Sequence, residues 1–293
     1  MFKRLCLIGV GLIGGSIAKA ACAHQLAQTI VGVGRQADLV NLKRAKSLQV
    51  IDEFYTDIET AVADADCIII ATPVTSTKAI FEQLKPFWCE QTIYSDVGST
   101  KGSVIIAAQQ VFGFVPPNFI PAHPIAGAEQ SGVDAALIDL FLNKRLILTP
   151  TEKTDTQAMH TMRLFWEKMG AIVSEMAVVQ HDHVLAATSH LPHILAFALV
   201  DMLGHRDTQE DIYKYAAGGF RDFTRIAASD PSMWQAICVA NQLEISALID
   251  QFKSELTNIQ HLLETNNESA LFELFSFANQ ARQQFLIHSN LQK

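Results

Sequence analysis

Residues 1–22 have the sequence MFKRLCLIGVGLIGGSIAKAAC. An apolar run with strand character, residues 4–8, leads directly into glycines, and a helical pattern follows over residues 12–23. The glycines at positions 9, 11 and 14 have the G-x-G-x-x-G spacing of dinucleotide-binding proteins. A secretory signal also combines basic and apolar residues, but these glycines would interrupt its helix. The stretch therefore predicts a strand, a tight turn and a helix that together bind a dinucleotide.

Each residue of this fingerprint has its own task in binding. Gly9 permits the turn, Gly11 lets the backbone approach a pyrophosphate, and Gly14 allows the helix to pack closely on the strand. Leu12 and Ile13 begin the helix, whose N-terminal N–H groups are donors for the anion. We expect these five residues to bind the cofactor.

The end of the second predicted strand, residues 29–33, bears on the choice between NAD and NADP. In NAD-binding proteins an acidic residue at this point binds the ribose 2′-hydroxyl. Gly34 and Arg35 stand here instead, and an arginine suits the 2′-phosphate of NADP. The pattern therefore favours NADP. The alternative is a solvated Arg35, with Asp38 binding the ribose after a shift in the turn.

Further β-rich runs alternate with helical patterns, which predicts a parallel α/β sheet. These runs are residues 67–71, 92–95, 118–121 and 145–148. Ligands gather at the carboxyl ends of the strands in such sheets. The residues that follow the strands are therefore candidates for the site, beginning with Thr72 and Pro73 beside the cofactor.

From about residue 178 onward the pattern is helical to the end of the chain. Residues 194–200 are apolar on every side, which predicts a helix buried on all its faces. We expect an α/β Rossmann-type dinucleotide-binding domain over residues 1–175, followed by an all-α domain over residues 176–293. Helices this apolar favour a homodimer formed through the helical domain, although a closed monomeric bundle also fits.

The composition excludes several classes of protein. A net charge of -8 opposes binding to nucleic acid or to an anionic membrane surface. No other apolar run approaches the length of about 20 residues that spans a bilayer. The five cysteines are odd in number and never form a Cys-x-x-Cys pair, which suits a reducing cytoplasm. We expect a cytoplasmic protein without nucleic-acid or membrane partners.

Two candidate catalytic residues lie just after predicted strands. His123 precedes Pro124, and a neutral imidazole can accept the proton of a hydroxyl whose carbon loses hydride. A hydrogen-bonded structural histidine explains this position equally well. Ser99 could orient that imidazole or contact the nicotinamide amide, and its alternative is a helix N-cap before Lys101.

The helical half offers a candidate carboxylate site. Arg221 and Arg225 are four residues apart, so on a helix they share a face and could bind a carboxylate in bidentate fashion. The alternative is a solvated basic face, which the neighbouring aromatic residues make less favourable. Four histidines at positions 181, 183, 190 and 193 raise the question of a metal site. No cysteine or Glu-x-x-His pattern joins them, so we expect no metal.

Five motifs, taken in order, resemble the prephenate and arogenate dehydrogenase family of tyrosine biosynthesis. The first is shared by many dehydrogenases, whereas the other four are specific. The motifs are GVGLIGGS at 9–16, DVGSTK at 96–101, HPIAG at 123–127 with Glu129, Ser131 and Gly132, SHLPH at 189–193, and GFRDFTR at 219–225.

The resemblance implies oxidative decarboxylation of prephenate to 4-hydroxyphenylpyruvate, with hydride transfer to NAD(P). By the same resemblance His123 is the catalytic histidine that accepts a hydrogen bond from the ring hydroxyl, and Ser99 assists it. The second histidine of the SHLPH motif, His193, implies that prephenate is accepted, with arogenate as a candidate second substrate. The residues implied to bind the dianionic substrate are Arg225, Arg221, His193, Glu129 and Trp234.

Two rival functions share the fold. A hydroxyacid dehydrogenase also joins a Rossmann domain to helices, but it typically relies on a lysine in the helical part. A Rossmann protein that senses NADP would bind the cofactor without turnover. Because function depends on the site rather than on the fold, the motifs around His123 and Arg225 favour the dehydrogenase of the tyrosine pathway.

Overall fold

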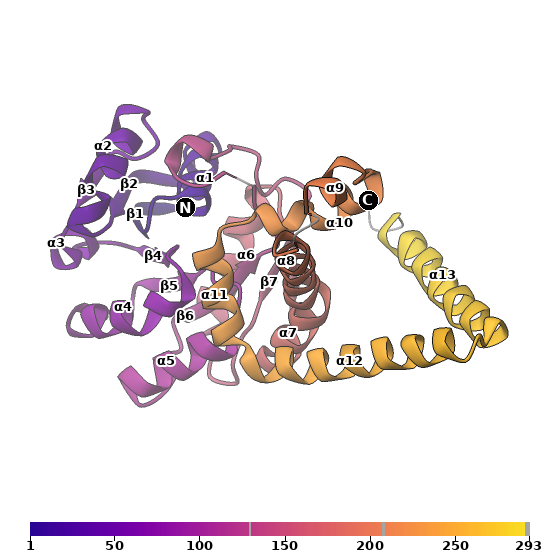
Figure 1. Cartoon of the computed structure of the whole chain (residues 1–293). Helices are drawn as coiled ribbons and strands as arrows, with labels where there is room; N and C mark the ends of the chain where they lie inside the picture. Colours follow the sequence, from indigo (N-terminus) through magenta and orange to yellow (C-terminus); the bar gives the residue numbers. More distant parts are fainter. Residues whose placement is uncertain (129, 207–208, 291–293) are drawn as a thin grey trace. The chain divides into compact units, whose positions relative to one another are not determined.

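The computed structural model describes residues 1–128, 130–206 and 209–290 (Figure 1). The chain forms two compact units, Met1–Gln242 and Leu243–Lys293. The first unit contains the whole sheet together with helices on both its faces and a further helical segment. It holds every candidate site residue that the structure describes.

The described part of the chain forms one eight-stranded sheet in the order β3-β2-β1-β4-β5-β6-β7-β8. Its strands are β1 Phe2–Ile8, β2 Ala27–Val33, β3 Glu53–Tyr55, β4 Cys67–Ile70, β5 Ile93–Asp96, β6 Phe119–Pro124, β7 Arg145–Leu148 and β8 Ile172–Glu175. The central strands are buried on both faces, which explains their nearly continuous runs of Ile, Leu and Val. The predicted α/β Rossmann-type fold, with a helical region after the sheet, is confirmed.

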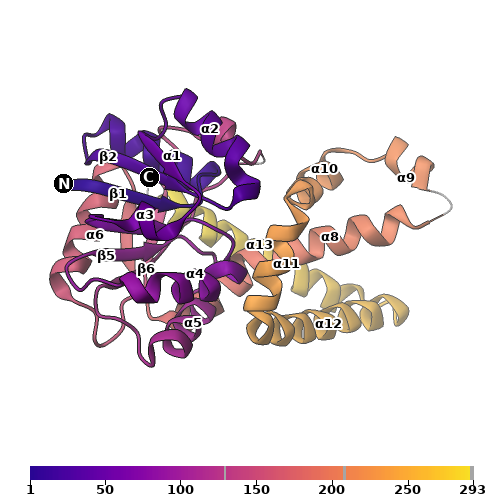
Figure 2. The same ribbon diagram turned by 90° about the vertical axis from the view of Figure 1, so that its left-hand side faces the viewer.

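Helices cover both faces of this sheet (Figure 2). One core lies under α1, α2 and α6, and a second lies under α3, α4 and α5. These helices are α1 Leu12–Ala23, α2 Leu39–Ser47, α3 Ile58–Val62, α4 Thr77–Leu84, α5 Gly102–Phe112 and α6 Thr156–Lys168. The connections of the sheet also contain four short 3₁₀ turns, η1 Gln36–Asp38, η2 Val74–Ser76, η3 Lys85–Phe87 and η4 Val133–Ala135.

The turn between β1 and α1 has the geometry that the glycine pattern predicts. Gly9 has φ +96, and a Cβ placed there would lie 2.8 Å from the carbonyl oxygen of Ala71. A Cβ at Gly14 would lie only 2.0 Å from the carbonyl oxygen of Gly9. Neither position has room for a side chain, because the strand, the turn and the helix touch at both places.

The prediction of an entirely parallel sheet is wrong in one place. β7 runs antiparallel to β6, with His123 opposite Ile147, whereas β7 and β8 are parallel to each other. Strand direction depends on how the chain returns to the sheet, and a buried apolar strand has the same composition in either direction. β3 and β8, which the sequence did not predict, are three and four residues long and lie at the two edges of the sheet.

The helical segment of the first unit begins at Val178, where the sequence analysis places it. Its elements are α7 Val178–Leu185, a π-helical turn η5 Ala186–His190, α8 Leu191–Gly204, α9 Gln209–Lys214, α10 Gly218–Thr224, a 3₁₀ turn η6 Arg225–Ala228 and α11 Pro231–Ala240. Only Ala196 of α8 is fully buried within one chain, among the residues that the structure describes. The expectation that residues 194–200 are buried on all faces is therefore wrong for the single chain.

The continuous helical run Val178–Gly204 has 27 residues and a mean hydropathy of 1.4 in its most apolar window. By length and composition it is able to cross a membrane, contrary to the expectation that no further run approaches that length. One such helix is weak evidence, because the core helix of a soluble protein has the same properties. This run also carries the buried polar residues His181, Asp182 and His190, which bond to other parts of the first unit.

The described part of the second unit is formed by two long helices, α12 Gln242–Glu264, whose first residue belongs to the first unit, and α13 Glu268–Asn290. Each has 23 residues, and large apolar side chains remain exposed along both. These exposed side chains are Leu243, Leu256, Leu263, Phe272, Phe275, Phe277, Phe285 and Ile287.

Candidate active site

A cavity of about 850 Å³ opens at the carboxyl ends of β1, β4 and β5. Its wall combines the turns after these three strands with Ala128, residues 130–132 and residues of α11. Six of the predicted site residues line it: Gly11, Leu12, Ile13, Thr72, Pro73 and Ser99. The cavity therefore gathers residues that are far apart in the sequence at the edge where α/β sheets bind ligands.

The part of the cavity next to α1 fits the pyrophosphate of a dinucleotide. A Cβ at Gly11 would meet no atom within 4 Å, so the backbone there faces open space. The first turn of α1 has no side-chain cap and no acidic residue, which leaves its N–H groups available to an anion. The hydroxyl of Thr72 is buried without a hydrogen-bond partner among the described residues. These features fit a bound nicotinamide dinucleotide.

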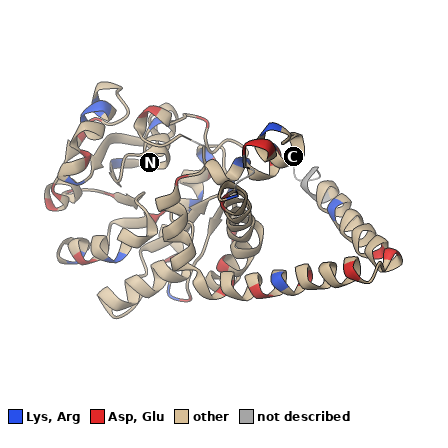
Figure 3. Cartoon of the chain, in the orientation of Figure 1, with Lys and Arg blue, Asp and Glu red and all other residues tan. Residues whose placement is uncertain are grey.

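Charged side chains contribute little to the described wall of this cavity. Asp230 is the one charged residue among the described lining residues. α11 carries no Lys, Arg, Asp or Glu and is drawn tan along its length (Figure 3). Backbone N–H groups must therefore supply most of the positive potential for the cofactor phosphates.

Alanine substitutions at Gly14 and Gly11 should separate packing from cofactor binding. Gly14→Ala places a methyl group against the Gly9 carbonyl and should lower the free energy of unfolding by about 1–3 kcal/mol. Gly11→Ala puts its methyl group into open space, so it should leave thermal stability unchanged and weaken dinucleotide binding about tenfold or more. Thermal unfolding and a fluorescence titration with the dinucleotide measure the two effects. Equal dinucleotide affinity in wild type and Gly11→Ala would contradict this placement of the pyrophosphate.

Arg35 lies outside the lining of the cavity and is exposed, with 84% of its side chain accessible. Its Nε and Nη2 donate to the carboxylate of Asp38 over 3.0 and 3.2 Å, and the Arg35 N–H also donates to Asp38. The hydrogen bond from Arg35 holds the pKa of Asp38 below its usual value, although burial opposes this shift. The two residues weighed for ribose recognition are thus bonded to each other.

His123 lies within β6, the strand next to β5, and is 8% exposed. It is not among the described residues that line the cavity. Its Nδ1 lies 2.9 Å from Nε2 of His181. Burial lowers the pKa of His123 well below its usual value, and the neighbouring His181, Lys101 and His190 lower it further. His123 is therefore a neutral imidazole at pH 7, which is the state that a general base requires.

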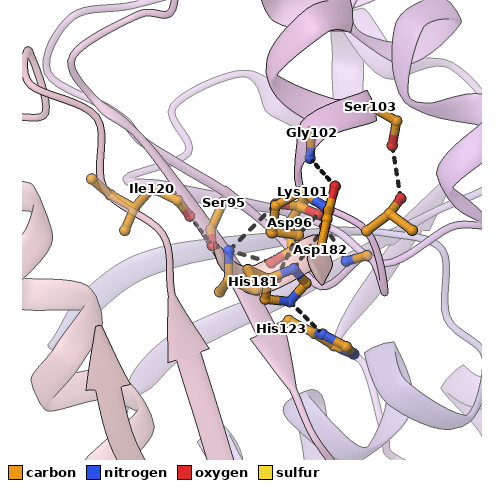
Figure 4. A network of polar contacts seen from close by, with 12 residues as sticks. Ser95, Asp96, Lys101, Gly102, Ser103, Ile120, His123, His181 and Asp182 are labelled. Atoms are coloured by element: carbon orange, nitrogen blue, oxygen red, sulfur yellow. Dashed lines mark hydrogen bonds and ion pairs between the residues drawn. The ribbon is translucent and has the colours of Figure 1, made fainter. Parts of the chain in front are cut away.

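Behind His123 lies a buried polar network that joins α7 to the start of α5 (Figure 4). Nδ1 of His181 lies 2.8 Å from Oδ1 of Asp182. The backbone N–H of Lys101 donates to the same oxygen over 2.8 Å, and the N–H of Gly102 donates to Oδ2 over 2.8 Å. Burial raises the pKa of Asp182, but the hydrogen bonds from His181, Lys101 and Gly102 lower it more, so Asp182 is a carboxylate.

A buried ion pair supports the other side of the same loop. Nζ of Lys101 lies 2.5 Å from Oδ2 of Asp96 and donates to the carbonyl oxygen of Ala122 over 2.7 Å. Asp96 Oδ2 also accepts the N–H of Gly98, which anchors the turn that carries Ser99. Asp96 and Lys101, the first and last residues of the DVGSTK motif, are thus paired with each other and fix the turn between them. Removing one partner would leave an uncompensated charge in the core.

Of the residues expected to bind the substrate, the structure brings together His193, Trp234 and Arg225. Arg221 is described but not placed with them, and Glu129 lies outside the described residues. The ring of His193 stacks on Trp234, with centroids 3.7 Å apart. His193 Nδ1 donates to the Ser189 carbonyl over 2.8 Å, which directs the other ring nitrogen away from the helix backbone. Burial lowers the pKa of His193, the Ser189 hydrogen bond raises it, and the charge of Arg225 lowers it, which places Arg225 nearby.

Arg221 and Arg225 are both exposed, at the end of α10 and the start of η6. Glu129, also expected in the substrate site, lies outside the described residues.

The sequence analysis did not predict roles for His181 and Asp182 beyond weighing His181 as a metal ligand. In the described ranges no three His, Cys, Asp or Glu residues cluster as a metal site. In the sequence, the signal that could have pointed to His181 and Asp182 was their adjacency at the start of the helical region.

Comparison with known proteins identifies the family to which the chain belongs. Family models for the nucleotide-binding domain and the dimerization domain of prephenate dehydrogenase match residues 17–175 and 178–277. The chain is 35% identical over 286 residues to the cyclohexadienyl dehydrogenase of Zymomonas mobilis, covering 96% of each chain. It is 38% identical to the prephenate dehydrogenase of Bacillus subtilis, covering 96% of this chain and 76% of that protein.

Solved structures give the same result. The prephenate dehydrogenase of Aquifex aeolicus, in complex with hydroxyphenyl propionate and NAD+, superposes with a TM-score of 0.89 at 34% identity over 97% of this chain and 99% of that one. The arogenate dehydrogenase of Synechocystis superposes with a TM-score of 0.80 at 27% identity over 96% and 99%. Because both family models and these relatives span nearly the whole chain, it belongs to the prephenate dehydrogenase family.

Proposed function

We propose that this protein catalyses the oxidative decarboxylation of prephenate to 4-hydroxyphenylpyruvate in tyrosine biosynthesis. The observation that carries this proposal is a neutral, buried His123 in the strand next to β5, whose following turn lines a cavity that fits a dinucleotide. In the reaction the hydroxyl-bearing ring carbon loses hydride, and the opposite carbon loses carbon dioxide and leaves its bonding electrons in the ring. The nicotinamide supplies the hydride acceptor. The ring becomes aromatic, which drives the reaction.

His123 would accept the hydroxyl proton as hydride leaves and return it to the phenolic oxygen once the ring is aromatic. Ser99, in the wall of the cavity after β5, would orient the hydroxyl or the imidazole. Arg225 would bind a substrate carboxylate, with Arg221, His193, Trp234 and Glu129 in the same pocket. The stacking of His193 on Trp234 and the charge of Arg225 near His193 support this group.

Nicotinamide reduction by the purified protein tests the proposed function. Prephenate and arogenate should each be paired with NAD and with NADP, and the reaction followed at 340 nm. Turnover with prephenate supports the proposal and agrees with the presence of His193, and turnover with arogenate would add arogenate as a second substrate. If a folded protein binds a dinucleotide but no mixture turns over, the hydroxyacid dehydrogenase and the NADP sensor become the better explanations.

For the cofactor we propose that NADP is preferred through Arg35. An exposed guanidinium at the end of β2 is available to a 2′-phosphate, while Asp38 beside it can accept a ribose hydroxyl of NAD. The protein would then use both dinucleotides, with Arg35 responsible for the preference.

Arg35→Ser should lower kcat/KM for NADP about 10- to 150-fold and leave the value for NAD within about threefold, because a hydrogen bond to a charged group contributes about 1.5–3 kcal/mol. Arg44→Ser is the matched control, since Arg44 is also an exposed arginine paired with an aspartate, Asp134. Steady-state kinetics with both dinucleotides measure the ratio. An unchanged ratio in Arg35→Ser would mean that Arg35 is a solvated side chain and would favour Asp38 as the ribose ligand.

For assembly we propose a homodimer formed through the helical domain, with the domain boundary at residues 175–176. Only 22% of the most apolar window of Val178–Gly204 is buried within one chain. α12 exposes large aliphatic side chains, and α13 exposes large aromatic ones. Surfaces of this kind are typical of subunit interfaces. The two family regions, which end at 175 and begin at 178, support the boundary. The five free cysteines support a cytoplasmic location.

A further inference from the structure

We propose that Asp182 and His181 are positioning residues that fix the tautomer of His123 and stabilise the imidazolium formed when His123 accepts a proton. The three side chains form one buried chain of hydrogen bonds, which runs from the start of α5 through α7 to β6 (Figure 4). The catalytic consequence rests on the proposed function, whereas the tautomer itself does not.

The donors and acceptors of Asp182 determine the first proton position. Both carboxylate oxygens accept backbone N–H groups, from Lys101 and from Gly102, and such groups can only donate. Asp182 is therefore an acceptor toward every partner described here. Nδ1 of His181, 2.8 Å from Oδ1 of Asp182, must then carry the proton and donate it.

The second proton position follows from the first. A neutral His181 with its proton on Nδ1 has a bare Nε2, which can only accept. His123 Nδ1 lies 2.9 Å from this atom, so it must carry the proton and donate. Nε2 of His123 is then the unprotonated nitrogen. Two links of the chain thus place the basic lone pair of His123 on the nitrogen that does not face His181.

The same chain acts when His123 gains a proton. Burial and the neighbouring groups Lys101, His181 and His190 all oppose a positive charge on His123. Asp182 is the carboxylate that reaches His123 through His181, whereas Asp96 is bonded to Lys101. As His123 becomes an imidazolium, its bond to His181 becomes charge-assisted, and the positive charge of the pair faces Asp182.

Asp182 also has a structural task that the test must separate from this one. It accepts the first N–H groups of α5, and a Cβ at Gly102 would lie 2.8 Å from its Oδ2, so its carboxylate sits tightly against the helix start. Asp182→Asn removes the charge and replaces one of the two acceptor oxygens with an N–H₂ donor, so the side chain no longer fixes a single proton position on His181. His181→Phe keeps a ring in the buried position and leaves Asp182 on α5, but it removes the acceptor for His123.

Nitrogen-15 NMR of the protein labelled at its ten histidines reads the tautomers directly. His123→Asn identifies the His123 signals by their absence. We expect the wild-type spectrum at pH 7 to show His123 protonated at Nδ1 and bare at Nε2. In Asp182→Asn and in His181→Phe this single tautomer should be lost. A wild-type spectrum with the His123 proton on Nε2, as a doubly protonated His181 would require, overturns the proposal.

Kinetics supply the second readout. Both variants should lower kcat for prephenate by about 10²- to 10⁴-fold with KM changed less than about threefold, and should move the acid limb of the pH profile. Thermal unfolding shows whether each variant folds, and His181→Phe carries the test if Asp182→Asn does not. If Asp182 only caps α5, His181→Phe keeps wild-type kcat, which overturns the proposal. If no protein, wild type included, oxidises prephenate while the spectra are as expected, the proposed function fails and the tautomer assignment stands.

Discussion

Replacing His123 with asparagine is expected to lower kcat for prephenate oxidation by about 10²- to 10⁴-fold, the range that a positioned general base contributes. Asparagine keeps a similar volume and a polar end but cannot accept a proton. The substrate carboxylates would be bound elsewhere, at Arg225 and its neighbours, so KM should change less than about threefold. Steady-state kinetics and a dinucleotide titration measure the two effects separately.

His160→Asn is the matched control, since His160 is an exposed histidine on α6, outside the described lining of the cavity. It should keep wild-type kcat and KM. A His123→Asn protein that folds, binds the dinucleotide and retains kcat within about threefold of wild type would remove His123 from the chemistry.

The dependence of kcat/KM on pH is a second test of His123 as the general base. Only neutral His123 accepts a proton, so kcat/KM should rise with pH through the pKa of His123 and then stay level. Because burial, His181, Lys101 and His190 lower that pKa well below 6.5, the rise should lie on the acid side of pH 6.5 and activity should be level around neutrality. The acid limb should disappear from the residual activity of His123→Asn.

Arg225→Ala is expected to lower kcat/KM for prephenate about 10- to 150-fold, mainly through a higher KM. A charge-assisted bond from an arginine to a carboxylate contributes about 1.5–3 kcal/mol, and the protein as a whole has a net charge of -8 that repels a dianion. The ratio of kcat/KM between wild type and Arg225→Ala should be larger at low ionic strength than at high ionic strength, because salt screens exposed charges. Initial rates over a range of prephenate concentrations measure kcat and KM.

Lys214→Ala is the control, because it removes a positive charge from the same helical segment. The side chain of Lys214 lies over the ring of Tyr215. It should leave KM within about twofold. A loss confined to kcat in Arg225→Ala would contradict a binding role and would place Arg225 closer to the reacting carbon.

Local patterns in the sequence predicted the parts of the fold that depend on neighbours in the chain. The glycines at 9, 11 and 14 predicted a strand, turn and helix, and α1 begins and ends at the predicted residues, Leu12 and Ala23. The direction of β7 and the short strands β3 and β8 were beyond such patterns. A three-residue strand carries too few side chains to show a period, and an edge strand has little apolar burial.

The candidate site divides in the same way. Residues of the cofactor turn lie together because they follow neighbouring strands, and the order of those strands can be expected from the fold class. The contact of His123 with His181 joins residues 58 positions apart across two kinds of secondary structure. Nothing in the composition around residue 181 reports that contact. The pairing of Arg35 with Asp38, three residues apart, was within reach of local analysis, but its effect on the cofactor was not.

The π-helical turn at Ala186–His190 limits the insertions and deletions that the chain can tolerate there. A π turn holds one more residue than an α turn, and one residue corresponds to about 100° of rotation about the helix axis. The extra residue therefore determines the rotation of α8 about its axis relative to α7. With this rotation His181 contacts His123 of β6, while His193 contacts Trp234 of α11. A deletion of one residue here would turn the whole of α8 away from Trp234, although no side chain of the site had been altered. The spacing between the two histidines is as much a part of the site as the histidines themselves.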